Sequence, residues 1–270
     1  MNPNKDLWEK GDFTKIAATM RGSGEWLVSE IDKQLPMNAL DLGCGDGTTA
    51  VPLAKFGVNV LGVDIARNLV EAGNRRAEEK RLSNLRFQEG DACRLEGLGD
   101  ASFDLTLSVF GAMFAPRPFD VAQEMVRVTK PGGQIVMGNW IPNDPTSFVS
   151  QVLKISSAFV PPPPEGFVSP MTWGVESHVL ERFGKAGVEA KNISMVKDTF
   201  FFVASMTIDQ FIDLFKNYYG PTMNAFDAAA KEGREQELLR QLLESAQSQN
   251  VATDGTINIG ATYLKVTVRR

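Results

Sequence analysis

The sequence predicts an α/β protein whose core is a doubly wound, mainly parallel sheet. Short runs of apolar and β-branched residues alternate with longer segments of helical periodicity. The first three short runs end at acidic residues, Asp41, Asp64 and Asp91. Ligands of open α/β sheets bind at the carboxyl ends of the strands, so this pattern also indicates the edge that carries function. The 270 residues suffice for one large domain of this class with an insertion.

The first predicted strand covers residues 39–42, and a glycine loop follows it directly. Gly43, Gly45 and Gly47 occupy alternate positions, and a helical run over residues 48–56 comes next. Glycine permits the positive φ angles of a tight strand-to-helix turn and leaves the backbone bare, so a ligand can lie against main-chain N–H groups. A dinucleotide-binding loop has the different spacing Gly-x-Gly-x-x-Gly.

Two acidic residues accompany this loop, Asp41 before it and Asp46 inside it. Their carboxylates would repel the pyrophosphate of NAD, whereas they suit a ligand that carries an ammonium and a sulfonium group. The charge pattern therefore favours S-adenosylmethionine (SAM) over NAD. Cys44 lies between two of the glycines, where a small side chain is sterically required, and we expect no redox or nucleophilic role for it.

The second predicted strand covers residues 58–64 and ends at Asp64, 23 positions after Asp41. A carboxylate about 20 residues after the first acid can accept hydrogen bonds from both hydroxyls of a ribose. NAD-binding and SAM-binding folds share this feature, and a plain helix N-cap is the structural alternative. Ile65 is then expected to pack on the adenine, and a helix follows over residues 67–82.

The third predicted strand covers residues 85–92 and ends in Asp91-Ala92 after a glycine. Gly-Asp is common turn chemistry, but a third acid at a strand end favours a place in the ligand site. The fourth strand, residues 103–109, includes Ser108 and leads into an apolar segment that suits a hydrophobic small molecule.

A helix over residues 119–129 precedes the turn Lys130-Pro131-Gly132-Gly133 and a fifth strand over residues 134–140. This turn, the glycine loop, the acid of strand two and the Gly-Asp-Ala end of strand three occur in the order typical of one family. The sequence resembles the class I SAM-dependent methyltransferases, especially their ubiquinone/menaquinone-biosynthesis-like (methyltransferase type 11) small-molecule branch. The resemblance covers residues 37–141.

The resemblance implies a Rossmann-like, seven-stranded sheet whose last strand is antiparallel. In that family the acid after strand three accepts from the adenine amino group, and the next backbone N–H serves a ring nitrogen. The end of strand four passes beside the methionine moiety. The residues that we expect at the cofactor are Asp41, Gly43, Cys44, Gly45, Asp64, Ile65, Asp91, Ala92 and Ser108.

Residues 1–36 are expected to form an N-terminal helical cap. Two helical pieces are predicted within residues 5–35, with a break at Arg21-Gly22-Ser23-Gly24 and an end at Pro36. In the family such helices fold over cofactor and substrate, which would place several side chains in the pocket; ordinary amphipathic packing is the alternative. These side chains are Trp8, Phe13, Ile16, Ala17 and Met20.

Residues 206–252 are expected to be a helical insertion between strands six and seven, because the family's sheet ends in a hairpin of these strands. The insertion would lie above the active-site edge as a lid; a packing or dimerisation element is the alternative. The core would then comprise residues 37–205 and 253–270. The other predicted elements are helices over 148–159, 175–183 and 207–219, a helix around 238–243, and strands over 188–203 and 264–268.

Composition narrows the class of protein further. The formal net charge of −5 argues against a nucleic-acid partner, since phosphate contacts need a basic face. No apolar run approaches the roughly 20 residues of a membrane-spanning helix, and the first residues lack the apolar region of a signal peptide. With only two cysteines in separate loops, we expect a reduced, cytoplasmic setting. The sequence does not distinguish a monomer from a homodimer.

The reaction implied by the resemblance is transfer of the SAM methyl group to a small, apolar or aromatic molecule, at oxygen, nitrogen, sulfur or carbon, without a metal. An NAD-dependent oxidoreductase and a non-catalytic SAM-binding protein are the alternatives. The sequence identifies no catalytic base, and the lone His178 is assigned no role. Four polar residues are candidates for facing the substrate: Asn139, Asp144, Tyr218 and Tyr219.

Overall fold

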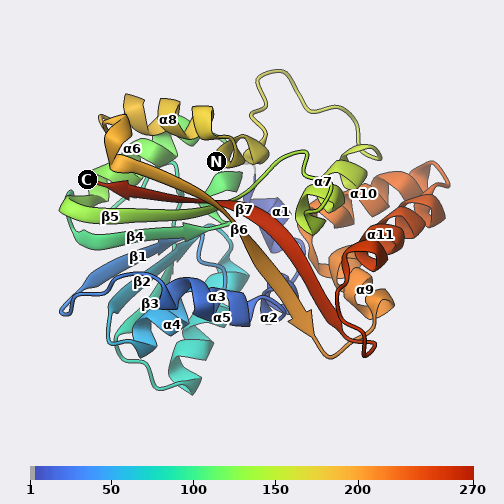
Figure 1. The fold of residues 1–270 in the computed structure, drawn as a ribbon, viewed down its shortest axis with the longest axis horizontal. Coiled ribbons are helices and arrows are strands. Elements are labelled where there is room, and N and C mark those ends of the chain that lie inside the picture. Colours follow the sequence, from blue (N-terminus) through green and yellow to red (C-terminus); the bar gives the residue numbers. More distant parts are fainter. Residues whose placement is uncertain (1–3) are drawn as a thin grey trace.

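A single seven-stranded sheet forms the core of the protein in the computed structural model, which describes residues 4–270 (Figure 1). The strand order is β3-β2-β1-β4-β5-β7-β6, and β7 runs antiparallel to both of its neighbours. The sheet predicted from the sequence is therefore confirmed, including its antiparallel last strand. The strands are β1 (Asn38–Leu42), β2 (Asn59–Asp64), β3 (Leu85–Glu89), β4 (Phe103–Val109), β5 (Thr129–Trp140), β6 (Ile193–Ala204) and β7 (Ile257–Arg269).

Helices cover both faces of this sheet, which is why its central strands are apolar on both sides. Helices α3, α4 and α5 lie on one face and α6 and α8 on the other (Figure 1). The α-helices are α1 (Lys5–Glu9), α2 (Phe13–Ala18), α3 (Arg21–Ser29), α4 (Ala50–Lys55), α5 (Arg67–Glu79), α6 (Pro118–Val128), α7 (Phe148–Ser157), α8 (Glu176–Lys185), α9 (Ile208–Tyr218), α10 (Gly220–Lys231) and α11 (Glu235–Gln249). Three short 3₁₀ helices complete the set: η1 (Ala112–Phe114), η2 (Pro170–Gly174) and η3 (Ala190–Asn192).

Parallel pairing brings the ends of the first strands to one edge. Asp41 of β1 pairs with Gly62 of β2 and Leu107 of β4, while Asp64 at the end of β2 pairs with Glu89 of β3. The turns after β1, β2, β3 and β4 consequently share the carboxyl edge of the sheet. This register positions the functional site.

The N-terminal region differs from the prediction of two helices broken at residues 21–24. It forms three helices, and α3 begins at Arg21, so the predicted break lies inside the first turn of a helix. Gly24 allows α3 to pack closely against Thr48, because a Cβ at this position would lie 2.7 Å from the Thr48 backbone oxygen. The helix ends at Ser29, well before Pro36.

Elements after α6 also differ from the prediction; β7, for example, begins at Ile257 and not at residue 264. β5 begins at Thr129, which pairs with Phe103 of β4. The Pro-Gly-Gly segment is held by Arg270, directly after β7: the Gly132 N–H donates to the Arg270 oxygen, and the Arg270 N–H donates to the Gly133 oxygen. Helix α10 was not predicted, because the helical spacing that predicts α9 ends at Tyr219 and the next apolar pattern begins at Leu238. Proline at the first turn favours the start of a helix. Three helices, α9, α10 and α11, therefore lie between β6 and β7.

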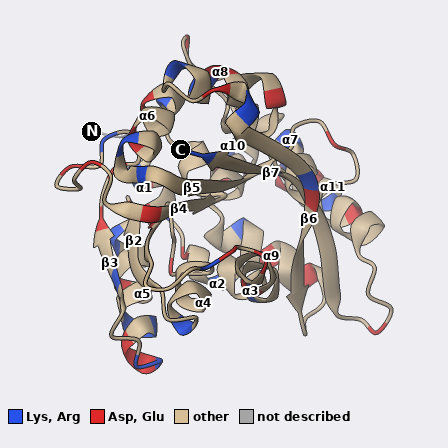
Figure 2. Cartoon of the chain, turned by 60° about the vertical axis from the view of Figure 1, so that its left-hand side comes forward, with Lys and Arg blue, Asp and Glu red and all other residues tan. Residues whose placement is uncertain are grey.

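Charged residues of both signs are interleaved over the helices and loops, while the strands are mostly free of them (Figure 2). Among residues 4–270, no helix combines the length and the apolar composition that crossing a bilayer requires.

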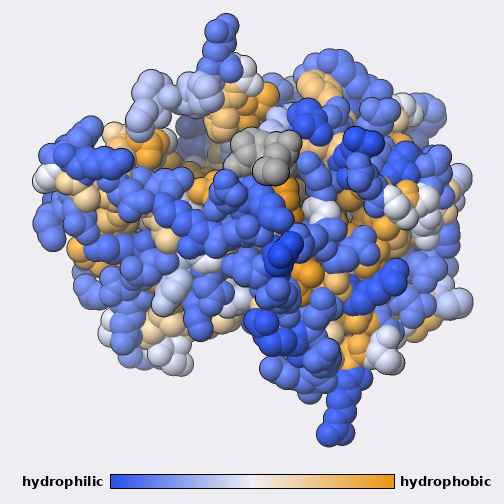
Figure 3. Space-filling model, turned by 180° about the vertical axis from the view of Figure 1, so that it is seen from behind, coloured by the Kyte–Doolittle hydropathy of each residue, from blue (hydrophilic) through white to orange (hydrophobic). Residues whose placement is uncertain are grey.

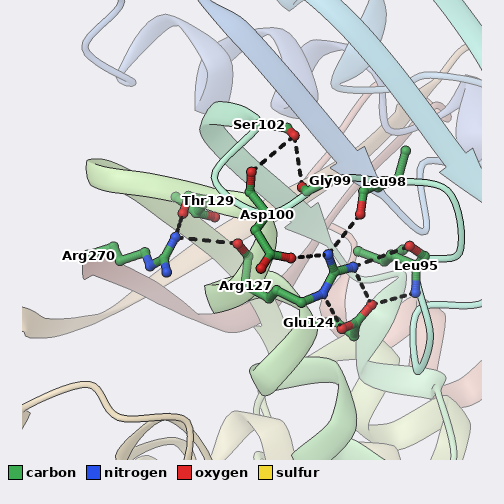
Figure 4. Close-up of polar contacts among 9 residues, drawn as sticks. All are labelled: Leu95, Leu98, Gly99, Asp100, Ser102, Glu124, Arg127, Thr129 and Arg270. Carbon is green, nitrogen blue, oxygen red and sulfur yellow. Dashed lines mark hydrogen bonds and ion pairs between the residues drawn. The ribbon is translucent and has the colours of Figure 1, made fainter.

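Arg127, in the last turn of α6, fastens the loop that precedes β4 at the opposite edge of the sheet (Figure 4). Its guanidinium pairs with Glu124 at 2.6 Å and with Asp100 at 2.8 Å, and it also donates to the backbone oxygens of Leu95 and Leu98. These carboxylates raise the pKa of Arg127 above its ordinary value. The cluster holds the last turn of α6 to the loop over residues 95–100.

Candidate cofactor site

A cavity lies at the carboxyl edge of the sheet, between the turns after β1, β2 and β4 and the N-terminal helices. The water-accessible space in this first cavity is about 100 Å³. Six of the nine residues predicted at the cofactor line it, and three do not. Those that line it are Gly43, Cys44, Gly45, Asp64, Ile65 and Ala92.

The glycine loop turns sharply after β1 because its backbone is held against β2. The N–H groups of Gly43 and Cys44 both donate to the Val63 oxygen, at 2.7 and 3.2 Å. Gly43 has φ +66°, and a Cβ there would lie 2.6 Å from the Gly111 Cα, so only glycine fits. A Cβ at Gly45 would meet nothing within 4 Å. The loop therefore presents bare backbone to open space in the first cavity.

Asp64 is one of two carboxylates that line this cavity; the other is Asp46 of the glycine loop. It accepts from the Gly45 N–H at 2.8 Å through Oδ2 and from the Ala66 N–H at 3.0 Å through Oδ1. The side chain is thus fixed at the end of β2, and the residue is 8% exposed. Burial raises its pKa, although the backbone hydrogen bonds oppose this effect. Each oxygen keeps further acceptor capacity for hydroxyl groups of a ligand.

Asp41 lies beneath the loop and does not line the first cavity. Its Oδ2 accepts from the Thr49 hydroxyl at 2.6 Å, while its Oδ1 has no hydrogen-bond partner among the described residues. Burial raises the pKa of Asp41 to about 7, with the nearby Asp64 charge adding to the effect. The structure therefore places this acid as a support of the loop and of the start of α4.

The charge argument that rested on Asp46 is corrected by the structure. Asp46 is 3% exposed and pairs with Arg21 of α3 at 2.5 Å and with Arg76 of α5 at 3.5 Å. The Arg76 guanidinium also donates to the Asp46 backbone oxygen. Two cations thus compensate this carboxylate, which ties the loop to two helices. Neither arginine was recognised from the sequence, because their contacts span 25 and 30 residues.

The side chains of Asp91 and Ser108 form hydrogen bonds with backbone groups near the first cavity and do not line it. Asp91 Oδ1 accepts from the Cys93 N–H at 2.8 Å and so shapes the turn after β3, where Ala92 lines the first cavity. The Ser108 hydroxyl donates to the Leu42 oxygen at 2.7 Å and accepts from the Ala112 N–H at 3.0 Å. It braces the end of β4 against β1.

Aromatic side chains close the opposite wall. Phe110 has φ +60°, which is unusual for a residue with a side chain, and its ring stacks on Trp140 with centroids 3.4 Å apart. Phe114 of η1 contacts Trp8 of α1, with ring centroids 4.9 Å apart. Four of the five N-terminal residues predicted to face the pocket line it: Trp8, Phe13, Ala17 and Met20.

None of the four polar residues expected to face the substrate lines the first cavity. Asp144 is buried in a network with Lys197 and Thr262, at 2.8 and 2.9 Å, which lowers its pKa despite the burial. Asn139 and Tyr219 are buried as well. Asn139 lies in β5, and strand alternation alone cannot say which face of the sheet a cavity occupies; Asp144 lies in a loop, and Tyr218 and Tyr219 lie at the end of α9.

Comparison with known proteins agrees with this geometry. The model of the family described as "Methyltransferase domain" matches residues 40–137. An uncharacterised protein of Mycobacterium tuberculosis is 30% identical over 234 residues, which cover 84% of this chain and 80% of that protein. The demethylmenaquinone methyltransferase of Paenarthrobacter aurescens is 29% identical over 67% of this chain and 75% of its own length.

A solved structure shares the fold. The YcgJ protein of Bacillus subtilis superposes with a TM-score of 0.60 at 20% sequence identity, covering 92% of this chain and 98% of the other. The matched region, residues 40–137, contains the glycine loop and all three acidic strand ends. The strand order, the antiparallel β7 and the matched family point to one enzyme class, which is not that of the NAD-dependent oxidoreductases. The chain belongs to the class I S-adenosylmethionine-dependent methyltransferases.

Proposed function

We propose that this methyltransferase binds SAM in the first cavity and transfers its methyl group to a small, largely apolar molecule. The observation that carries the proposal is the position of Asp64 beside the bare backbone of Gly43–Gly45, at the carboxyl edge of the sheet. Bound SAM supplies an electrophilic methyl group on a sulfonium. The open side of Gly45 is the space that a Cβ would obstruct, so the residues present fit a nucleoside ligand.

Each part of the cavity has a distinct task in this proposal. Asp64 accepts hydrogen bonds from the ribose hydroxyls, while Ile65 and the Ala92 backbone contact the adenine. The glycine loop lets the amino-acid portion lie against the main chain. Asp41 and Ser108 hold the loop and the end of β4 in place from beneath. Fixing two reactants in this way supplies about 7–11 kcal/mol of a bimolecular barrier.

The N-terminal helices act as a cover in this proposal. The cavity of about 100 Å³ is smaller than the roughly 300–1,000 Å³ of typical ligand pockets. Trp8 and Phe13, from α1 and α2, form part of its wall, so cofactor entry requires these helices to move outward. The contacts that this motion would break are between polar groups at the surface, such as the Lys5–Glu89 pair at 2.9 Å, the Lys10–Asp227 pair at 2.6 Å and the Asn68 amide on the Gly11 oxygen at 3.1 Å.

The lining supports a small apolar acceptor. Side chains such as Phe110, Phe114 and Phe200 border the cavity on the side away from Asp64. The relative named demethylmenaquinone methyltransferase takes its name from a small-molecule acceptor, in agreement with this chemistry. We propose in addition that the 206–252 insertion covers the substrate rather than the cofactor, because no residue of it lines the first cavity.

Calorimetry with S-adenosylhomocysteine tests the assignment of Asp64. Asp64→Ala removes a charged acceptor from the ribose hydroxyls, and we expect binding to weaken by about 1.5–3 kcal/mol, or roughly 10- to 150-fold. Asp213→Ala, on the exposed face of α9, serves as the matched control and should leave affinity unchanged. Equal affinity of the Asp64→Ala variant and the parent protein would refute the role. A parent protein that binds NAD instead would refute the proposed cofactor.

A further inference from the structure

A second cavity lies beside the first, beneath the loop over residues 158–169 that joins α7 to η2. Its volume is about 860 Å³, within the range of pockets that enclose a small molecule. Figure 3 shows a hollow beneath this projecting loop, with hydrophobic side chains at its rim. The apolar part of its lining comes from α1, η1, α7, the loop and η2, and includes Leu7, Phe114, Leu153, Val160, Phe167 and Met171.

The two cavities share part of one wall. Asn4 and Phe114 line both of them. The Asn4 amide donates to the Phe114 oxygen, and the Trp8 ring packs edge-on against the Phe114 ring. This thin partition is made of side chains and the first turn of α1, so the two spaces join when α1 shifts.

The charge distribution indicates an uncharged occupant. The two charged residues in the lining, Lys154 and Glu165, are both exposed and of opposite sign. The interior instead offers hydroxyl and amide groups. Ser156 is 4% exposed, lines the cavity, and its hydroxyl has no hydrogen-bond partner among the described residues. A buried unpaired hydroxyl is costly, and once the Ser156 side chain rotates toward the cavity, a ligand hydroxyl or carbonyl would satisfy it.

The loop over the cavity exposes apolar surface that the protein does not cover. Phe167 and Val168 are 56% and 41% exposed although both line the cavity. Exposed apolar side chains gathered at the rim of a concave surface are typical of ligand-binding grooves. Pro221 and Asn224 of α10 complete the wall, so the 206–252 insertion contributes to this cavity and not to the first.

We infer that the second cavity binds the body of an elongated, neutral and mainly apolar methyl acceptor, whose reactive end reaches the first cavity past Asn4 and Phe114. This inference rests on the proposed function and assigns the acceptor a site of its own. The acceptor is a lipid-like or fused-ring molecule with a hydroxyl or carbonyl group. Its apolar body contacts the loop and α7, and its polar group lies within reach of Ser156.

Fluorescence titration with Nile red, a neutral apolar dye, tests the inference, with farnesol as a competing ligand. We expect Nile red to bind saturably and farnesol to displace it. Saturating S-adenosylhomocysteine should change the dissociation constant of Nile red by less than twofold. Displacement of the dye by S-adenosylhomocysteine would overturn the inference, because the dye would then lie in the cofactor site. Failure of S-adenosylhomocysteine to bind in parallel calorimetry would count against the proposed function and not against the second cavity, which the variants below test independently.

Two substitutions fill the second cavity from α7. Leu153→Trp places a bulky ring in the apolar wall of the second cavity. Ser157→Trp places the same ring there from an exposed position, where a substitution disturbs the fold less. Each variant should bind Nile red at least tenfold more weakly than the parent. Leu180→Trp, at a partly exposed leucine of α8 that lines neither cavity, is the control and should bind as the parent does. If Ser157→Trp melts like the parent and also binds Nile red like the parent, the inference is wrong.

Discussion

At the scale of single residues, Asp41 shows how a buried carboxylate links the site to folding. It is 1% exposed, and its pKa of about 7 in the folded protein compares with an ordinary value of 3.8. Between these two values the folded protein binds a proton that the unfolded chain has released. The free energy of unfolding therefore falls as pH rises from about 4 to about 7, by on the order of 4 kcal/mol for this group.

Asp41→Asn removes this dependence because an amide stays neutral and still accepts from Thr49. We expect the variant to exceed the parent in stability at pH 8, and the difference to shrink toward pH 5. Urea denaturation at several pH values measures it. Asp213→Asn, an exposed carboxylate on α9, is the control. Parallel curves for Asp41→Asn and the parent would show that the Asp41 carboxyl does not titrate as the structure indicates.

At the scale of elements, Arg127 shows how one side chain holds a loop to a helix. It makes charged hydrogen bonds to Glu124 and Asp100 and reaches two backbone oxygens of the loop (Figure 4). Arg127→Met leaves these acceptors without their donor. We expect a loss of about 2–3 kcal/mol in the free energy of unfolding.

Chemical denaturation measures this loss, and Arg240→Met provides a matched control. Arg240 pairs with Glu244 at 2.8 Å on the exposed face of α11, where such a pair contributes about 0.5 kcal/mol or less. The affinity for S-adenosylhomocysteine should stay unchanged in both variants, since neither residue lines the first cavity. A large change in affinity for Arg127→Met would indicate coupling across the sheet.

At the scale of the whole molecule, the N-terminal helices connect the two cavities. α1 and α2 rest on α5, and Lys10 pairs with Asp227 of α10 at 2.6 Å. The same helices therefore touch the core and the 206–252 insertion. A cofactor under this cover should stabilise its closed position.

Hydrogen exchange tests this motion. With S-adenosylhomocysteine at 100 times its dissociation constant, a ligand specific for the closed form stabilises it by about 2.7 kcal/mol. We expect the amides of residues 5–18 to exchange up to about 100-fold more slowly, whereas those of α8 keep their rates. If residues 5–18 exchange at the same rate with and without ligand, the helices do not act as a cover.

The sequence was sufficient for the sheet, the glycine loop and the acids that end its first strands. Strand alternation, turn residues and helical periodicity are local properties, and parallel pairing places every strand end at one edge without further information. For this reason Asp64 and Gly45 were predicted from the pattern of residues, whereas Ala92 was predicted from the family resemblance; all three line one cavity.

Other features depend on contacts between distant segments, and no local pattern encodes them. Arg21 and Arg76 pair with Asp46 from two different helices. The net charge at the glycine loop therefore could not be predicted from the sequence of the loop itself. The sequence around Gly24 predicts a break in the helix, whereas the structure requires this glycine for packing against Thr48. The second cavity forms where α1, α7, α10 and the loop over residues 158–169 meet. Its shape follows from long-range packing, which sets where side chains point, whereas local sequence sets only where helices and strands begin and end.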